Sequence, residues 1–308
     1  MNGRTKTNPG DTEENQMDGS KKILVTGATG HQGGAIANEL LGKQASIRVM
    51  TRHPESPKAR ALAARGAEVV AGDLDDAASV EKALHGVWGA FAVQNTWEAG
   101  VKKEEEQGKR FATLAKKAGV QHLVYSSVAS AQRKTGIPHF DNKWRVEETI
   151  RGLGFPSTVI LRPVFFMENF LLPSILPGIQ QGTLAFGIEP DTVLQMIAVK
   201  DIGRHGARAF EQASELNGRA IDLAGDQLTM PEVVKVLSEA SRQKVAFFRV
   251  PTAEIRKFSE DYAAMVEWFD RVGYDVDIEG LAKETGVRPT KFADWAKTID
   301  WAEQPAAR

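Results

Sequence analysis

The sequence contains no cysteine in its 308 residues. This excludes disulfide bonds, thiol nucleophiles and thiolate metal ligands, so any redox chemistry must belong to a bound cofactor. No run of residues approaches the roughly 18 consecutive apolar residues that span a bilayer, and no membrane partner is expected. The formal net charge of −1 argues against a generally basic protein that binds nucleic acid directly.

Two other kinds of site are also missing. None of the six histidines stands at a metal-ligand spacing from another histidine or a nearby carboxylate, so no metal site is predicted. No serine lies in the context of a nucleophile elbow. Residues 1–20 are polar and lack the apolar centre of a secretory signal, which predicts a disordered leader and, by default, a cytoplasmic location.

Short apolar runs alternate with helical periodicity from Lys22 to Leu161. This alternation predicts an α/β fold: a Rossmann-type doubly wound parallel sheet with helices on both faces. The strands read as nearly continuous apolar runs, as expected when both faces of a sheet are covered. The predicted strands are 23–25, 47–50, 68–71, 90–93, 122–125 and 158–161.

The regular alternation of strand and helix patterns ends after Arg162-Pro163, where prolines and glycines interrupt the chain. We therefore expect a Rossmann domain over 21–162 and a smaller α/β substrate or partner domain over 163–302, with the alternative that the late chain returns to the sheet. The smaller domain should cover the C-terminal edge of the sheet, where such folds bind ligands. Its predicted strands are 193–199, 220–223 and 244–250, and its predicted helices include 201–212 and 252–269, the latter with Phe258 on its apolar face.

A glycine-rich turn follows the first strand and opens a helix. Gly27 permits the tight turn, Gly30 lets the backbone approach a pyrophosphate, and Gly33 allows close packing of the helix on the sheet. The free N–H groups of the helix terminus then face the phosphates. The alternative, an ordinary glycine-rich connection, is disfavoured by the strand–turn–helix context. The predicted dinucleotide contacts are Gly27, Ala28, Thr29, Gly30, His31, Gln32 and Gly33.

The end of the second strand favours NADP(H) over NAD(H). Where NAD-binding proteins carry an acid for the ribose 2′-hydroxyl, this chain has Arg52, which can pair with a 2′-phosphate, and Lys58 is nearby. Arg52 could instead be an ordinary surface arginine. Asp73 and the adjacent Leu74 are placed to reach the adenine region, although a helix N-cap at Asp73 or Asp75 is an alternative.

The chain resembles the NmrA-like family, within the atypical short-chain dehydrogenases, from Lys22 to about Trp295. The residues that carry the resemblance are Gly27-Ala-Thr-Gly-His-Gln-Gly33, Thr51-Arg52, Gly72-Asp73, Val93-Gln-Asn-Thr-Trp97, His139-Phe-Asp-Asn-Lys143, Glu147-Glu148, Arg162-Pro163 and Glu168-Asn169. The resemblance implies NADP(H) binding, and it implies that the cofactor is lined by Gly27 to Gln32, Arg52, Gln94, Asn95, Lys143, Phe166, Met167, Glu168 and Asn169.

One departure from typical short-chain dehydrogenases concerns catalysis. Those enzymes place a proton-donating tyrosine four residues before a lysine, whereas this chain has His139 before Lys143. The candidate catalytic residues are therefore Lys143, which would hold the nicotinamide ribose, and His139 or Ser127 as proton donor, with water as the alternative source of the proton. A structural role for His139 is the alternative. Tyr125 is expected to pack in the core with its hydroxyl hydrogen-bonded.

Two assignments made from residue type bear on the site. The aromatic residues Phe165, Phe166, Phe170 and Trp97 are predicted either to wall a flat substrate or nicotinamide ring, or to belong to the core. The charged run from Lys102 to Glu106 is predicted to be a solvated helix face.

Two functions remain open from the sequence. The resemblance implies either an NADPH-dependent reductase of quinones or related small carbonyl compounds, or a non-catalytic sensor of the NADPH/NADP⁺ ratio that regulates a protein partner. A missing tyrosine is tolerable for quinones, because the reduced product is a stabilised oxyanion. A monomer or a homodimer is expected.

Overall fold

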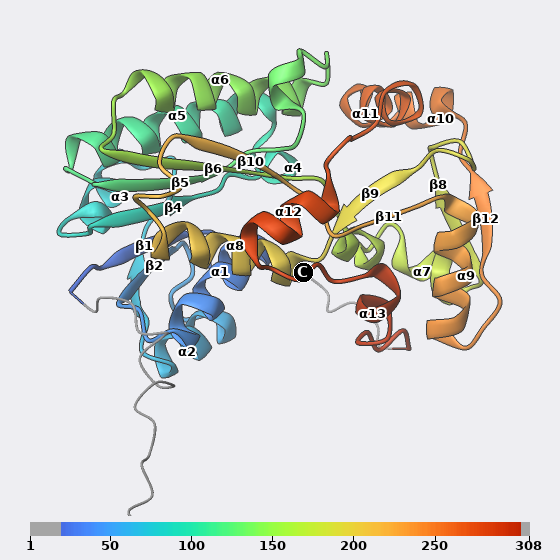
Figure 1. The fold of residues 1–308 in the computed structure, drawn as a ribbon, viewed down its shortest axis with the longest axis horizontal. Coiled ribbons are helices and arrows are strands. Elements are labelled where there is room, and N and C mark those ends of the chain that lie inside the picture. Colours follow the sequence, from blue (N-terminus) through green and yellow to red (C-terminus); the bar gives the residue numbers. More distant parts are fainter. Residues whose placement is uncertain (1–19, 303–308) are drawn as a thin grey trace, which may run out of the picture.

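A computed structural model of the chain describes residues 20–302 (Figure 1). Its centre is a seven-stranded sheet in the order β10-β6-β5-β4-β1-β2-β3, in which all neighbouring strands are parallel. The strands are β1 (Ile23–Thr26), β2 (Ile47–Thr51), β3 (Glu68–Ala71), β4 (Gly89–Ala92), β5 (His122–Ser126), β6 (Ser157–Pro163) and β10 (Arg219–Leu223). The predicted Rossmann-type sheet is confirmed.

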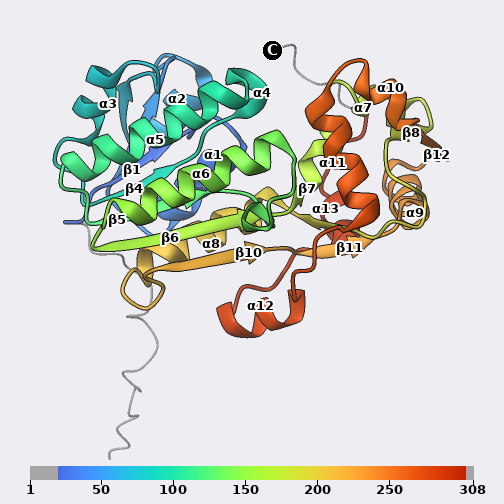
Figure 2. The same cartoon turned by 90° about the horizontal axis from the view of Figure 1, so that it is seen from above.

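Helices cover both faces of this sheet: they lie above and below the strands in Figure 1, and Figure 2 looks down on one of the two faces. On one face, Phe111, Val146 and Ile150 join a core with apolar residues of β4 and β5. On the other face, Ile36, Leu40 and Ile202 form a second core. The helices are α1 (His31–Gly42), α2 (Pro57–Ala64), α3 (Ala77–Leu84), α4 (Thr96–Ala99), α5 (Val101–Lys117), α6 (Pro138–Gly152) and α8 (Val199–Glu211).

The chain crosses from one part of the molecule to the other more than once. Although β10 follows β6 by more than fifty residues, it pairs in parallel with β6, from Arg219 opposite Val159 to Leu223 opposite Pro163. Helix α8 packs along α1, where Gly203 and Gly206 let the two helices approach closely. Residues 163–302 therefore contribute one strand and one helix to the sheet layers. Leu281, on α12 (Ile278–Thr285), also packs into the sheet core.

The remaining elements form what we call the C-terminal unit, at the right of Figure 1. Its two small sheets have the orders β11-β9-β7 and β12-β8. Its core is aromatic and includes Phe170, Phe186, Trp268 and Phe292. The elements are β7 (Phe165–Phe166), α7 (Leu176–Gln180), β8 (Thr183–Phe186), β9 (Leu194–Ile197), β11 (Asp226–Leu228), α9 (Met230–Ser241), β12 (Ala246–Arg249), α10 (Thr252–Arg256), α11 (Glu260–Arg271) and α13 (Phe292–Ala296).

The prediction of one helix over 252–269 is wrong, because the structure has two helices there. Ser259 begins α11 as its N-cap, with its hydroxyl accepting a hydrogen bond from Tyr262 N. Phe258 lies in the break between α10 and α11 and is 89% exposed rather than packed on an apolar face. The apolar spacing continued across the break and hid the capping serine.

No helix within residues 20–302 is both long and apolar enough to cross a membrane. The predicted disordered leader, residues 1–20, lies outside the described residues except for Ser20.

Candidate cofactor and active site

The glycine turn lies between β1 and α1, at the point where the sheet order reverses direction. Gly27 has a φ of 63°, a left-handed conformation that disfavours other residues. A Cβ on Gly33 would lie 2.4 Å from Thr26 O and 2.5 Å from Gly27 O, so only glycine fits there. Gly30 is the N-cap of α1 and offers no side chain to its N–H groups. The first N–H groups of a helix have no acceptor within the helix itself, so the start of α1 is a place where an anionic ligand could bind.

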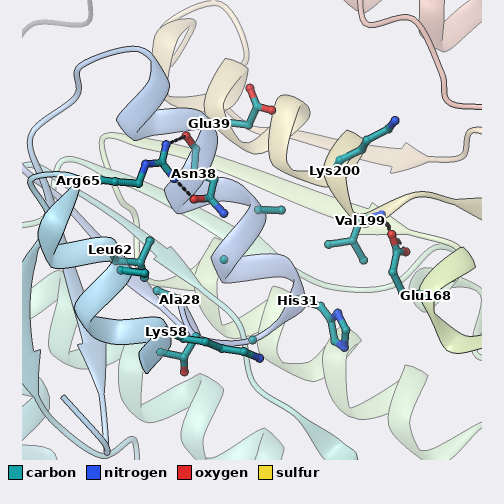
Figure 3. Close-up of a pocket in the computed structure, with 15 residues that line it drawn as sticks. Ala28, His31, Asn38, Glu39, Lys58, Leu62, Arg65, Glu168, Val199 and Lys200 are labelled. Carbon is teal, nitrogen blue, oxygen red and sulfur yellow. Dashed lines mark hydrogen bonds between the residues drawn. The ribbon is translucent and has the colours of Figure 1, made fainter. Parts of the chain in front are cut away.

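A cavity of about 540 Å³ lies beside this turn (Figure 3). Lys58 from α2 and Lys200 from α8 lie on its wall, together with His31. Arg65, also on the wall, is occupied by hydrogen bonds to Asn38. The wall therefore carries positive side chains near the start of α1, and also the carboxylates of Glu39 and Glu168.

Arg52 follows β2 and is half exposed. Its guanidinium forms an ion pair with Glu98, which lies on the short helix α4 that follows β4. The predicted anchor for a 2′-phosphate therefore has an anionic partner of its own in this structure.

Asp73 and Leu74 lie in the loop after β3. Asp73 Oδ1 accepts a hydrogen bond from Asp75 N, while Leu74 O accepts one from Arg110. The helix N-cap predicted at Asp73 or Asp75 is instead Asp76, whose side chain accepts from Ala78 N. A hydrogen bond from Lys103 lowers the pKa of Asp75, which ties that carboxylate to α5.

Gln94 and Asn95 follow β4. Gln94 is 5% exposed, and among residues 20–302 neither atom of its amide has a hydrogen-bond partner. Ser127, which follows β5, likewise has a buried hydroxyl without a partner in that range. Asn95 caps α4 through a hydrogen bond from Trp97 N. Buried polar atoms are normally satisfied, so the orphaned groups of Gln94 and Ser127 fit a site for a polar ligand at this edge.

Lys143 lies on α6. This helix begins at Pro138, so His139 and Lys143 lie one turn apart on one face. Lys143 Nζ is 2.9 Å from Glu104 Oε1 and lies 3.5 Å from Ser126 O, the carbonyl that ends β5. These contacts hold the ammonium group next to Ser127.

Glu104, the ion-pair partner of Lys143, was predicted to lie in solvent, and that prediction is wrong. It belongs to the run predicted to be solvated, yet it is 2% exposed. Asn142 Nδ2 donates to its second oxygen at 2.8 Å. The available signal was helical spacing, because Gly108, Phe111 and Ala115 mark the buried face of α5 on which Glu104 also lies.

His139 is buried in α6. Its Nδ1 lies 2.7 Å from Oδ1 of Asp261, which comes from α11 of the C-terminal unit. The ring of Trp97 lies 5.2 Å away, centroid to centroid. Asp261 was not among the predicted site residues, since nothing in its local sequence distinguishes it from other acids at a helix start.

The predicted aromatic wall divides between core and surface. Phe165 and Phe170 are buried in the C-terminal unit, Phe166 is half-buried, and Trp97 is 62% exposed. Tyr125 is buried as predicted, but its hydroxyl has no hydrogen-bond partner within residues 20–302, contrary to prediction. Burial raises its pKa well above the usual value.

The segment after β7 is largely occupied by structural contacts. Met167 is fully buried in the C-terminal unit. The carboxylate of Glu168 accepts from Val199 N at 3.0 Å (Figure 3) and from Trp295 Nε1 at 3.1 Å, which joins α8 to α13. Burial raises the pKa of Glu168. Phe166, Glu168 and Asn169 are half-buried, and Glu168 also lies on the wall of the cavity beside the glycine turn.

No group of three or more potential metal ligands occurs within residues 20–302. The parallel sheet, with a glycine turn at its switch point, defines a Rossmann-type dinucleotide-binding fold. The chain belongs to the NmrA-like family, whose sequence profile matches residues 19–303, so the resemblance seen in the sequence is confirmed.

Similar proteins include both enzymes and a regulator. An NmrA-like family domain-containing oxidoreductase of Aspergillus flavus is 36% identical over 251 residues, 74% of this chain and 75% of that protein. Alignments with several other fungal oxidoreductases of the family span about half of each chain. The NADPH-dependent quinone oxidoreductase of Escherichia coli, solved with NADPH, is 25% identical with a TM-score of 0.76, covering 90% of this chain and 99% of that one.

The negative transcriptional regulator NmrA, solved with NADP, superimposes with a TM-score of 0.75 at 20% identity, covering 93% of this chain and all of that one. This likeness concerns the fold. The same architecture therefore occurs in a reductase and in a regulator, and the residues of the site must decide between these functions.

Proposed function

We propose that this protein binds NADP(H) and reduces quinones or related small carbonyl compounds. The observation that carries the proposal is the arrangement at the end of β5: Lys143 is fixed beside Ser127, and His139 lies one turn earlier on the same face of α6. The ion pair with the buried Glu104 and the contact with the carbonyl that ends β5 keep the ammonium group of Lys143 at the carboxyl edge of the sheet, where folds of this kind bind ligands.

The residues present fit an NADP(H) molecule. The turn from Gly27 to Gly33 would hold the pyrophosphate, and Arg52 with Lys58 would hold the 2′-phosphate. Gln94 would satisfy its orphaned amide on the cofactor or substrate, and Lys143 would hold the nicotinamide ribose. When bound, NADPH supplies the hydride that this cysteine-free chain cannot provide itself.

The proposed substrate class rests on how strongly each kind of substrate depends on an acid catalyst in the site. A quinone accepts hydride to give a stabilised oxyanion, and it can take its proton from water. A simple carbonyl compound needs a donor, for which His139 and Ser127 are the candidates. The exposed ring of Trp97 beside His139 offers an apolar surface for a flat substrate. The likeness to a quinone oxidoreductase supports the same class.

The proposal is tested by cofactor binding and by turnover. Calorimetry should show saturable NADPH binding that is tighter than NADH binding, and a panel of quinones should cause loss of NADPH absorbance. Lys143→Met should lower turnover, but alone it would leave Glu104 buried without its cation. The double variant Lys143→Met/Glu104→Gln avoids this, and Lys102→Met, on the exposed face of α5, is the matched control.

The outcomes separate the two functions that the sequence left open. Failure to bind either nicotinamide cofactor would contradict both. Tight NADPH binding with no turnover on any quinone or carbonyl compound would favour a regulatory protein, a function that the likeness to NmrA also supports. A regulator should in addition bind NADPH and NADP⁺ with different affinities, or bind its partner only in one cofactor state.

A further inference from the structure

His139 and Asp261 form a pair that connects the sheet unit to the C-terminal unit. Asp261 Oδ1 lies 2.7 Å from His139 Nδ1 and also accepts from the backbone N–H of His139 at 3.3 Å. The two side chains are 9% and 16% exposed, so solvent and salt screen their interaction weakly. The imidazole in the position of the usual tyrosine therefore has its carboxylate partner on α11, more than a hundred residues away.

This contact determines which ring nitrogen is available. An ionised carboxylate only accepts hydrogen bonds, so in the neutral ring Nδ1 carries the hydrogen. Nε2 is then the nitrogen that can exchange a proton with a ligand. The ring plane is confined by Trp97 and by Phe140, whose centroids lie 5.2 Å and 4.8 Å from that of His139.

We propose that Asp261 is a positioning residue that holds His139 as the proton donor to a substrate oxygen. The inference rests on the proposed reductase function. The carbonyl carbon gains the hydride of NADPH, the electron pair of the C=O bond moves to oxygen, and that oxygen takes the Nε2 proton of His139 in its doubly protonated, imidazolium form. The products are an alcohol, NADP⁺ and the neutral Nδ1–H ring, which takes up one proton from solution before the next turnover. The substrate would thus receive both the hydride and the proton beside the first turns of α6, which carry His139 and Lys143.

The test compares two substrates that differ in their need for acid catalysis. Asp261→Asn keeps a side-chain oxygen that can accept hydrogen bonds from the backbone N–H and from Nδ1–H of His139, but it removes the negative charge. It should lower kcat for a simple aldehyde by roughly 10- to 100-fold at unchanged KM, because general acid catalysis supplies gains of at least this size. Turnover of a quinone should change little. Asp141→Asn, on the first turn of the same helix, is the matched control and should match the wild type.

A second measurement needs neither cofactor nor substrate. Nuclear magnetic resonance of isotope-labelled histidine, assigned with a His139→Gln variant, should show the neutral His139 ring as the Nδ1–H tautomer. Asp261→Ala should shift the ring towards Nε2–H, the form that a ring without an acceptor at Nδ1 usually adopts.

The outcomes keep this inference distinct from the proposed function. If the wild-type protein reduces neither substrate, the reductase function fails and the donor role fails with it. If the wild type reduces the aldehyde and Asp261→Asn does so equally well, only the role of Asp261 fails. Equal losses for aldehyde and quinone, or an unchanged tautomer, would mean that the pair is structural, and either result overturns the inference.

Discussion

Arg52, which follows β2, is ion-paired with Glu98 on α4, the helix that also carries the exposed Trp97. Under the proposed function, the 2′-phosphate of NADP(H) and the carboxylate of Glu98 are competitors for one guanidinium. NAD(H) has no such phosphate and would leave the pair intact. The ion pair between Arg52 and Glu98 therefore weakens the binding of NADP(H) but not that of NAD(H), and so it lowers the preference for NADP(H).

Glu98→Gln should consequently tighten NADPH binding and leave NADH binding unchanged. Exposed ion pairs contribute about 0.2–1 kcal/mol, which corresponds to roughly a 1.4- to 5-fold lower Kd for NADPH. Isothermal titration with both cofactors measures the effect, with Glu106→Gln on the exposed side of α5 as control. An equal gain for NADH would show that the effect does not involve the 2′-phosphate.

Arg52→Asp should reverse the cofactor preference. The substitution removes a charge-assisted contact to the phosphate and supplies an acceptor for the ribose 2′-hydroxyl of NADH. Because hydrogen bonds to charged groups contribute about 1.5–3 kcal/mol, NADPH should bind roughly 10- to 100-fold more weakly. Arg60→Asp, on the exposed side of α2, should change neither Kd. Unaltered selectivity in Arg52→Asp would place the 2′-phosphate elsewhere.

Gly33→Ala should destabilise the protein and abolish NADPH binding. The new Cβ would overlap the carbonyl oxygens of Thr26 and Gly27, which are backbone atoms that cannot rotate away. Overpacking of this kind costs about 3 kcal/mol, more where the backbone cannot yield. Gly42→Ala, at the other end of α1 with no atom within 4 Å of the new Cβ, should leave stability unchanged or slightly raised. Thermal unfolding and calorimetry of both variants make the comparison, and a Gly33→Ala protein of normal stability would contradict the packing argument.

Stability should fall as the pH decreases from about 6.5 towards 4. Burial lowers the pKa of His122 and of His205 from 6.5 to about 4, so both rings are neutral in the folded protein. The unfolded chain binds protons that the folded chain does not, and each histidine then costs about 1.4 kcal/mol per pH unit in this range. Urea unfolding at a series of pH values measures the slope.

His122→Asn should remove one histidine's share of that slope, although it also disturbs the hydrogen bond between His122 Nδ1 and the hydroxyl of Ser157. For this reason the slope, rather than the stability at one pH, is the quantity to compare. His85→Asn, an exposed site, should keep the wild-type slope. A slope that is the same in all three proteins would show that His122 titrates normally when folded.

Sequence patterns predicted the sheet and the glycine turn well because both depend on short spacings. The apolar run from Ile23 to Val25 and the glycines after it determine the local backbone through sterics that involve adjacent residues. The same reasoning failed at Ser259, where an apolar period continued through a helix break, and at Glu104, where the letters of a charged run suggested solvent. The contact that decided the structure was the hydrogen bond from Tyr262 N to the Ser259 hydroxyl in the first case and the ion pair of Glu104 with Lys143 in the second. Neither contact can be read from the residue types along the chain.

The sequence by itself predicted the glycine-rich turn over residues 27–33 between a strand and a helix, since the steric requirements of such a turn involve adjacent residues. The structure added that α6 begins at Pro138, which places His139 and Lys143 on one helix face. Only the tertiary structure decided that Glu104 holds Lys143, that Asp261 meets His139, that Glu98 occupies Arg52 and that β10 completes the sheet. These contacts join segments far apart in the chain, and they depend on how whole elements pack, which no local spacing specifies.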